Sequence, residues 1–160
     1  MKLAVSSDST SNLTAAVLQH LKSKNVEVVP SGALADEAAD YVDAALATAE
    51  AVASGRADQG LIFCNTGTGV TIVANKVPGV RAALCPDPHS ARIARLANNA
   101  NVLVIGMRLT GEPLAREIVD AWLETGPSEE PRRVNFHRKT DEVDRRYRRD
   151  PKANLAGEKP

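Results

Sequence analysis

A thiol stands at the end of an apolar run, directly before a loop that contains two glycines. The segment of residues 62–76 reads IFCNTGTGVTIVANK, and the thiol belongs to Cys64. Thiolate is the reactive form of cysteine, and the amino terminus of a following helix favours it. Position alone leaves three interpretations open: a catalytic base, one wall of an anion-binding loop, or a small apolar residue that packs at a strand end.

The loop after Cys64 is rich in residues that let backbone N–H groups approach a ligand. It consists of Asn65, Thr66, Gly67, Thr68 and Gly69. The loop lacks both the lysine spacing of a P-loop and the full glycine fingerprint of a dinucleotide-binding turn, so nucleotide binding is not favoured. A turn of this kind at the start of a helix can still hold a small anion.

Bulk composition excludes several classes of partner. The chain has 160 residues, 43% of them hydrophobic, which suits one domain with one sizeable core. Twenty Lys and Arg residues balance twenty Asp and Glu residues, so no broad positive field is available for nucleic acid or an anionic membrane. The start of the chain turns polar too early for a signal peptide, and no segment is long and apolar enough to span a membrane. With two cysteines that match no metal or redox spacing, these features predict a cytoplasmic protein.

Short apolar runs alternate with segments of helical periodicity. The expected strands are KLAVS, VEVVP, QGLIFC, VRAALC and NVLVIG. The expected helices cover residues 12–24, 41–54, 88–98 and 113–124, and a further helix follows the glycine loop. Five β/α units with nearly continuous apolar strands predict a parallel sheet covered on both faces by helices, a doubly wound α/β sandwich. Ligands bind such sheets at the carboxyl ends of the strands, which here places the candidate loops at residues 6–12, 64–70, 85–89 and 106–111.

The composition changes after residue 125. From Gly126 the chain reads GPSEEPRRVNFHRKTDEVDRRYRRDPKANLAGEKP, with charges throughout and no long apolar stripe. We therefore expect an α/β domain over residues 1–125 and, over residues 126–150, a basic arm with a charged helix from about 138 to 149 that contacts another subunit. Residues 151–160 are expected to form a disordered tail.

Several motifs of the first 125 residues belong together. They are SSDSTSN, ADYVDAA, the continuous stretch EAVASGRADQGLIFCNTGTGVTIVANKVPGVRAALC, and ARIARLANNANVLVIGMR, followed by the basic arm. In this order they resemble the ribose-5-phosphate isomerase B family, which includes galactose-6-phosphate isomerase subunits and tetrose-phosphate isomerases. The resemblance implies a flavodoxin-like α/β fold and aldose–ketose isomerisation through an enediolate, without a metal or other cofactor. It also implies a dimer or tetramer with sites at the subunit interface.

The same resemblance assigns roles to individual residues. It implies that Cys64 is the base, that Thr66 moves protons between the substrate oxygens, and that Asp8 acts in the first loop. The loop N–H groups would stabilise the developing oxyanion. The implied substrate contacts are Ser9, Tyr41, Asn65, Gly67, Thr68, Gly69 and Asn98, and the implied phosphate ligands are Arg108, Arg133 and Arg138, with Arg132 as an alternative to Arg133.

This chain departs from the family pattern at three positions. Where the family has an Asp-His pair this chain has Asp8-Ser9, and where the family has His-Asn it has Ala97-Asn98. Both imidazoles that help to orient the substrate and open its furanose ring are therefore missing. Asn65 replaces a glycine and adds a side chain beside the substrate path.

The positions of the three histidines and of the second cysteine indicate their roles. His137 in the basic arm is the candidate to replace a lost imidazole. His20 is expected at the surface or partly packed, and His89 lies close enough to the ligand edge to remain a second candidate. Cys85 is expected to pack in the core.

Three hypotheses for function follow. The first is an isomerase of a pentose or tetrose phosphate with Cys64 as base. An acyclic four-carbon 4-phosphate would make the ring-opening histidines unnecessary. The second is the cysteine-bearing half of an enzyme completed by a paralogous subunit that carries the missing histidines. The third is a sugar-phosphate-binding protein that has lost catalysis.

Overall fold

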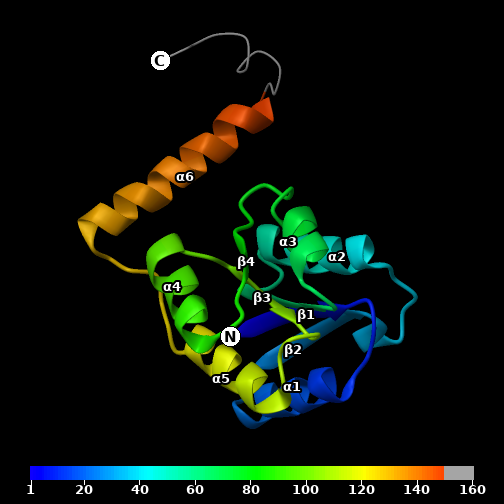
Figure 1. The fold of residues 1–160 in the computed structure, drawn as a ribbon. Helices are drawn as coiled ribbons and strands as arrows, with labels where there is room; N and C mark the ends of the chain where they lie inside the picture. Colours follow the sequence, from blue (N-terminus) through cyan, green and yellow to red (C-terminus); the bar gives the residue numbers. More distant parts are fainter. Residues whose placement is uncertain (150–160) are drawn as a thin grey trace.

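The computed structural model describes residues 1–149 and shows one α/β unit with a long helix at its side (Figure 1). The expected tail at 151–160 lies outside the described residues. The strands are β1 Lys2–Ser7, β2 Glu27–Gly32, β3 Gln59–Cys64, β4 Ala82–Leu84 and β5 Val102–Gly106. The helices are α1 Asn12–Ser23, α2 Tyr41–Ala53, α3 Thr68–Ala74, α4 Pro88–Asn98, α5 Glu112–Leu123 and α6 Pro131–Arg149, with a short 3₁₀ turn η1 at Ala33–Ala35. Within residues 1–149, no helix has the length and apolar character needed to cross a membrane.

All five strands pair in parallel, in the order β2-β1-β3-β5-β4. This confirms the predicted α/β class with a five-stranded parallel sheet. The order differs from that of flavodoxin, 2-1-3-4-5, because β5 lies between β3 and β4. As a result, the loops after β1, β3 and β5 are neighbours at the carboxyl edge of the sheet.

The two edge strands are protected in different ways. β2 contains Pro30, which has no N–H to offer to a further strand. The open side of β4 is covered by Asn75, whose side chain donates to the carbonyl of Ala82 and accepts from its N–H, each at 2.9 Å. Pro30 and Asn75 thus oppose the pairing of a further strand with either edge of the sheet.

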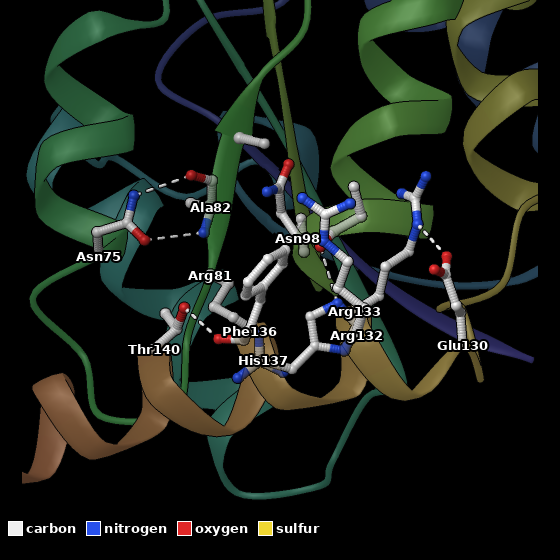
Figure 2. A pocket seen from close by; sticks show the side chains of 13 residues that line it. Asn75, Arg81, Ala82, Asn98, Glu130, Arg132, Arg133, Phe136, His137 and Thr140 are labelled. Atoms are coloured by element: carbon white, nitrogen blue, oxygen red, sulfur yellow. Dashed lines mark hydrogen bonds and ion pairs between the residues drawn. The ribbon is translucent and has the colours of Figure 1, made fainter.

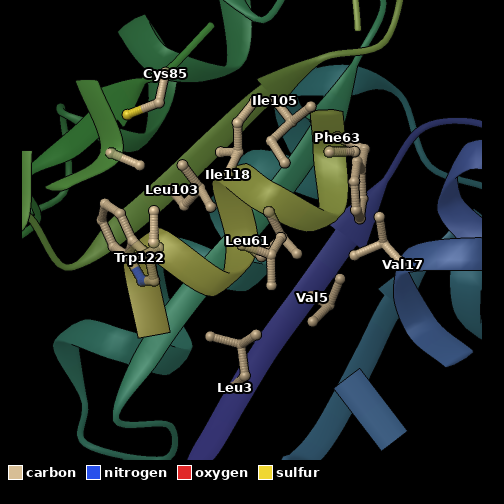
Figure 3. Close-up of a cluster of buried hydrophobic side chains, with 14 of the residues drawn as sticks. Leu3, Val5, Val17, Leu61, Phe63, Cys85, Leu103, Ile105, Ile118 and Trp122 are labelled. Carbon is tan, nitrogen blue, oxygen red and sulfur yellow. The ribbon is translucent and has the colours of Figure 1, made fainter. Parts of the chain in front are cut away.

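Helices cover both faces of the sheet. On one face α1, α4 and α5 enclose the larger core, which contains Leu61 and Phe63 of β3 and Trp122 of α5 (Figure 3). On the other face α2 and α3 cover Ile62 and Cys64, because successive side chains of a strand point to opposite faces. The alternation in QGLIFC therefore directs the thiol toward α2 and α3.

Local caps fix the starts of three helices. Ser11 forms a capping box with Thr14, with the Thr14 N–H donating to the Ser11 hydroxyl at 3.2 Å. The carboxylate of Asp40 accepts from the first turn of α2, and that of Asp87 accepts from the N–H of Ser90 in α4 at 2.8 Å. The cap at Asp40 makes Tyr41 the first residue of α2. These bounds agree with the sequence prediction within one or two residues.

The helix α6 begins at Pro131, earlier than the predicted start near residue 138. Proline is well tolerated at the first position of a helix because its missing N–H would have no partner there. The basic segment PRRVNFHRK is thus helical itself. Along α6, the side chains of Phe136, Val143 and Tyr147 are 46%, 55% and 44% exposed, so this helix carries apolar surface that residues 1–149 leave uncovered.

Candidate active site

The loop after β3 is anchored to the end of β5. The carbonyl of Cys64 accepts from the N–H of Met107 at 2.8 Å, and the carbonyl of Asn65 accepts from the N–H of Arg108 at 2.9 Å. Cys64 itself is 8% exposed and belongs to the apolar cluster between the sheet and helices α2 and α3. The thiol therefore sits at the boundary between the core and the carboxyl edge of the sheet.

Glycines allow this loop to lie directly against its neighbours. A Cβ on Gly106 would stand 2.7 Å from the carbonyl oxygen of Thr66, and a Cβ on Gly67 would stand 2.5 Å from the Cδ1 atom of Leu84. Gly67 also has φ +82°, which an L side chain rarely adopts. Residues other than glycine at 67 and 106 would displace the loop from the end of β5.

The first turn of α3 supplies polar groups beside Cys64. The hydroxyls of Thr66 and Thr68 are 2.9 Å apart, and either can donate to the other. The first N–H groups of a helix have no partner within the helix, so they are available to an anionic atom. Thr66, Thr68 and these N–H groups can together donate hydrogen bonds to a developing oxyanion.

Tyr41 lies over the glycine loop. The Cε2 atom of its ring is 3.0 Å from the place that a Cβ on Gly69 would occupy. The ring is 45% exposed, so one side is open to a ligand. The position of α2 relative to β1 is held by Ser6, whose hydroxyl donates to the carbonyl of Ala44 at 2.7 Å and accepts from Thr48 at 2.8 Å.

The loop after β1 ends at the same edge of the sheet. Ser7 is aligned with Phe63 in the pairing of β1 with β3, so Asp8 and Ser9 follow directly beside the end of β3. The hydroxyl of Ser9 donates to the carboxylate of Asp8 at 3.1 Å. The sequence-predicted residues of the first loop and of the glycine loop are thus brought to adjacent strand ends.

A pocket of about 370 Å³ opens next to this loop. Three of the sequence-predicted residues, Asn65, Thr66 and Arg108, line it. The other lining residues are Leu84, Pro86, Gly106, Leu109 and Thr110. Arg108 is the cationic side chain of this pocket, which suits its predicted contact with a phosphate.

A second pocket, of about 650 Å³, lies between α6, the end of α4 and the start of β4 (Figure 2). It contains Asn98 and Arg133, together with Arg81, Arg132 and His137. The Nε atom of Arg133 is 3.2 Å from the carboxylate of Glu130, which leaves a surplus of positive charge in the pocket. Guanidinium groups of this kind recognise phosphate through paired N–H donors.

The arginines of α6 point in different directions. Arg138 donates to Glu142 and to the side chain of Asn135 along the helix, and it is not among the residues that line the pocket. Arg132 does line it, with its guanidinium 5.5 Å from the centre of the Phe136 ring. The arm is helical, and residue 138 lies more than one turn after residues 132 and 133. Its side chain therefore points in a different direction from theirs.

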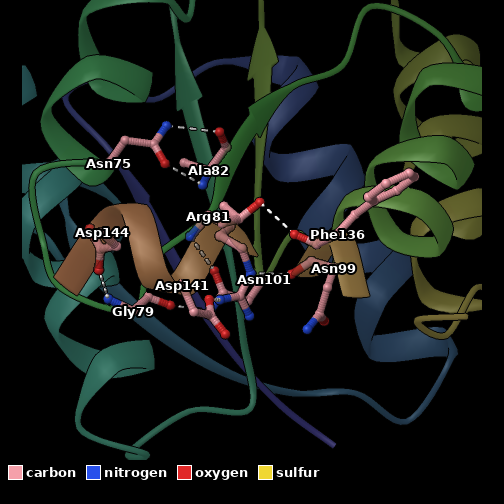
Figure 4. A network of polar contacts seen from close by, with 10 residues as sticks. Asn75, Gly79, Arg81, Ala82, Asn99, Asn101, Phe136, Asp141 and Asp144 are labelled. Carbon is pink, nitrogen blue, oxygen red and sulfur yellow. Dashed lines mark hydrogen bonds and ion pairs between the residues drawn. The ribbon is translucent and has the colours of Figure 1, made fainter. Parts of the chain in front are cut away.

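No pattern in the sequence points to Arg81, although it connects the start of β4 with the end of α4 and with α6 (Figure 4). Its Nε atom donates to the carbonyl of Asn99 at 2.6 Å, and its Nη1 atom is 3.1 Å from the carboxylate of Asp141 in α6. A second contact to α6 is the hydrogen bond from the N–H of Gly79 to Asp144 at 3.3 Å. Arg81 lies before a short strand in an apolar stretch, and no local sequence signal marks it.

The two groups of predicted residues lie at opposite edges of the sheet. Cys64 ends β3, whereas α4 starts after the carboxyl end of β4 and runs back, so that Asn98 lies before the amino end of β5. Asp8, Ser9, Tyr41, residues 64–69 and Arg108 are at the carboxyl edge. Asn98, Arg132 and Arg133 are at the other edge, so the structure of one chain does not join the two groups.

The second cysteine, Cys85, follows the carboxyl end of β4 but lines neither pocket. Burial raises the pKa of Cys85 to about 12, and the neighbouring negative charge of Asp87 adds to the effect. Cys85 is 1% exposed within the larger core, in keeping with the predicted packing role. His20 is bound to Asp120 of α5 at 2.7 Å, and His89 is exposed near the start of α4. Among residues 1–149, no three His, Cys, Asp or Glu side chains are grouped as a metal site.

Comparison with known proteins identifies the family. The sequence model described as "Ribose/Galactose Isomerase" matches residues 3–139. The chain belongs to this family of sugar-phosphate isomerases. The family match covers the glycine loop, the smaller pocket, the larger pocket except Thr140, and the arm up to Lys139. It confirms the resemblance inferred from the motifs.

Individual relatives are similar over most of their length. Ribose-5-phosphate isomerase B of Escherichia coli K12 is 45% identical over 107 residues, which are 67% of this chain and 72% of the relative. D-erythrulose-4-phosphate isomerase of Pectobacterium atrosepticum is 39% identical over 130 residues, 78% of this chain and 83% of the relative. The solved ribose-5-phosphate isomerase B of Clostridium thermocellum has a TM-score of 0.85 at 40% identity, covering 92% of this chain and 99% of its own.

Proposed function

We propose that this protein is an aldose–ketose isomerase of a small sugar phosphate, with Cys64 as the base that transfers the proton. The supporting observation is the position of Cys64 in a member of this isomerase family. It ends a buried strand at a glycine loop whose N–H groups, threonine hydroxyls and adjacent Arg108 face the carboxyl edge of the sheet.

The proposed reaction moves one proton between two carbon atoms. The Cys64 thiolate takes the proton from the carbon beside the carbonyl, and the electron pair moves to the carbonyl oxygen to give an enediolate. N–H groups at the start of α3 and the hydroxyls of Thr66 and Thr68 donate hydrogen bonds to the negative oxygen. The Cys64 thiol then returns its proton to the neighbouring carbon, and Thr66 passes the hydroxyl proton from one oxygen to the other.

The complete site is proposed to need two copies of the chain. Within one chain, Cys64 and Asn98 are at opposite edges of the sheet, so the pocket of Arg132 and Arg133 cannot serve the thiol of its own chain. A second copy would place its Asn98 and its arginines opposite Cys64 and bind the phosphate there. The exposed apolar side chains of α6 are suitable for such an interface.

The proposed substrates are open-chain four-carbon sugar phosphates, with pentose phosphates as the alternative within the same class. Ser9 and Ala97 provide no imidazole to open a furanose ring. A four-carbon sugar phosphorylated at its terminal oxygen cannot close such a ring through that oxygen, so it needs no ring opening. A relative that acts on D-erythrulose 4-phosphate, 39% identical, supports this choice.

A second candidate function is the cysteine-bearing subunit of a two-protein isomerase. The observation that favours it is the same pair of positions, because Ser9 and Ala97 leave this chain with the thiol and without the family's imidazoles. A paralogous subunit could then supply them across the interface. Isomerase activity of the purified chain by itself would exclude this function.

The experiment is solvent deuterium exchange followed by NMR, with erythrulose 4-phosphate, erythrose 4-phosphate, ribulose 5-phosphate and ribose 5-phosphate in heavy water. The wild type is expected to exchange the hydrogen on the carbon beside the carbonyl of at least one substrate. Cys64→Ala is expected to lose this exchange, while Cys85→Ala, the matched control, keeps it. Exchange by Cys64→Ala at the wild-type rate, or none by the wild type with any substrate, would reject the proposal.

A further inference from the structure

Four consecutive carbonyl groups near the end of α4 each have a hydrogen-bond partner. A helix leaves its last four carbonyls without partners inside the helix. Here the carbonyl of Ala94 accepts from Ala100 at 2.9 Å, that of Arg95 from Asn99 at 3.2 Å, and that of Leu96 from Ser128 at 3.1 Å. The carbonyl of Ala97 is 2.9 Å from the Nε2 atom of His137 in α6.

This contact fixes the proton on one nitrogen of the imidazole. A carbonyl oxygen can only accept, so Nε2 of His137 must carry the hydrogen of the bond. In the neutral ring the Nδ1 atom is then an acceptor with a free lone pair. Within residues 1–149, Nδ1 of His137 has no hydrogen-bond partner.

The neighbours of His137 in the pocket make an acceptor useful. Arg81, Arg132 and Arg133 are donors only, and they suit the oxygens of a phosphate. A sugar hydroxyl also needs a group that takes its hydrogen. The Glu130 carboxylate is engaged by Arg133, and the side-chain amide of Asn75 by Ala82. The acceptors that remain for the hydroxyls belong to Asn98, to His137 and to Thr140, whose own hydroxyl donates to the carbonyl of Phe136 (Figure 2).

We propose that His137, held by the Ala97 carbonyl with its proton on Nε2, binds a hydroxyl of the sugar phosphate through Nδ1. The role rests on the proposed function and adds a substrate-binding residue to it. His137, on α6, thereby brings a polar ring next to Ala97, whose methyl side chain cannot form a hydrogen bond. The bond between α4 and α6 fixes both the tautomer and the orientation of this ring.

Two variants separate substrate binding from simple capping of α4. In His137→Gln the amide nitrogen can occupy the place of Nε2 and keep the bond to Ala97, but no acceptor remains at the place of Nδ1. In His137→Asn the amide lies near the place of Nδ1 and cannot reach the Ala97 carbonyl. We expect His137→Gln to lower kcat/KM about tenfold at an unchanged melting temperature, as the loss of one buried hydrogen bond would. If His137 only caps α4, His137→Gln has wild-type kinetics and only His137→Asn shows a loss, which is a loss of stability.

A binding measurement tests the same role of His137 without catalysis. The variant Cys64→Ala, with ¹⁵N-labelled histidine, is titrated with erythrulose 4-phosphate, and the imidazole signals of His137 are assigned by their absence in His137→Gln. The Nδ1 signal is expected to shift while the Nε2 signal keeps its position. A phosphate signal that reports binding, with an unmoved Nδ1 signal, would overturn the role of His137 and leave the isomerase proposal intact. If the wild type neither binds nor exchanges any substrate, both proposals are overturned.

Discussion

Cys64 and Asn98 lie at opposite edges of one parallel sheet, Cys64 where β3 ends and Asn98 where α4 returns toward the start of β5. In the pairing of β3 with β5, Cys64 is aligned with Gly106, the last residue of β5. Asn98 instead precedes Val102, the first residue of β5. Four residue steps along a parallel strand cover about 13 Å, so the two side chains approach their ligands from different ends of the fold. We therefore propose that the residues that the sequence assigns to one site meet when two copies of the chain associate.

The two cysteines are expected to react at very different rates. Burial and the charge of Asp87 raise the pKa of Cys85 to about 12, so about one part in ten thousand of it is thiolate at pH 8. Cys64 lies beside the loop that the substrate is proposed to occupy. Iodoacetamide at pH 8, with peptide mass spectrometry, should modify Cys64 first, and sugar phosphate should slow that modification. Faster labelling of Cys85 would contradict this assignment of the two thiols.

Gly69→Ala is expected to impair activity more than stability. The new Cβ would stand 3.0 Å from the Cε2 atom of Tyr41, so the ring must move by a few tenths of an ångström or more. Because Tyr41 is 45% exposed, its ring can move at little cost in folding free energy, but the proposed contact of the ring with substrate would be lost. We expect kcat/KM to fall about tenfold, equivalent to about 1.4 kcal/mol, with a small change in melting temperature.

The matched control for that substitution is Gly126→Ala. A Cβ on Gly126 would meet no atom within 4 Å, and Gly126 does not have a positive φ. The kcat/KM of Gly126→Ala, measured by steady-state kinetics, should therefore equal that of the wild type. Equal effects of the two substitutions would show that the Tyr41 contact has no part in activity.

The ion pair between Arg81 and Asp141 is expected to hold α6 in the position that binds phosphate. The carboxylate of Asp141 is 46% exposed, so the pair contributes about 0.2–1 kcal/mol. Asp141→Asn should raise KM about two- to fivefold and leave kcat nearly unchanged. Glu129→Gln, which removes an exposed carboxylate just before the same helix, is the control. A KM in Asp141→Asn equal to that of the control would mean that the contact does not position α6.

Asp120 on α5 should make stability depend on pH in the acidic range. Burial acts to raise the pKa of Asp120, but hydrogen bonds from Lys24 and His20 outweigh it and hold that pKa below its usual value. A carboxyl group with a lowered pKa in the folded state stabilises the protein above its unfolded pKa, near 4, and loses this effect as pH falls through the folded pKa. Asp120→Asn should therefore lower the urea midpoint at pH 6 and have less effect at pH 3.

The control for the pH experiment is Glu117→Gln, an exposed carboxylate on the same helix. Its urea midpoint should follow that of the wild type at both pH values. A difference between wild type and Asp120→Asn that grows toward low pH would contradict the direction of the Asp120 pKa.

Local features of the fold could be predicted from the sequence because their causes are local. The start of α2 follows from the cap at Asp40, and the alternation of QGLIFC directs Cys64 and Ile62 to one face and Phe63 to the other. Strand order depends on how distant segments pack, so the insertion of β5 beside β3 had no local signal. The sequence also placed the arm helix too late, because its basic first turns lack the apolar periodicity that marks a buried helix.

The motifs nominate individual residues for the candidate site, but they do not predict its geometry. The motifs name Cys64 and Asn98 together, and only the topology shows that they lie at different edges of the sheet. Arg81 is missed because its role comes from the carbonyl of Asn99 and the carboxylate of Asp141, which are 18 and 60 residues away.

The most direct test of the two-copy site is complementation between inactive variants. Cys64→Ala keeps the arginine pocket, and the double variant Arg132→Ala/Arg133→Ala keeps the thiol. When equal amounts are unfolded and refolded together, half of the dimers contain one chain of each kind, and each of these has one complete site out of two. The account predicts recovery of about a quarter of the wild-type isomerase activity from two variants that are inactive separately. Mixed dimers that form, as shown by tags of different size, and remain inactive would contradict it.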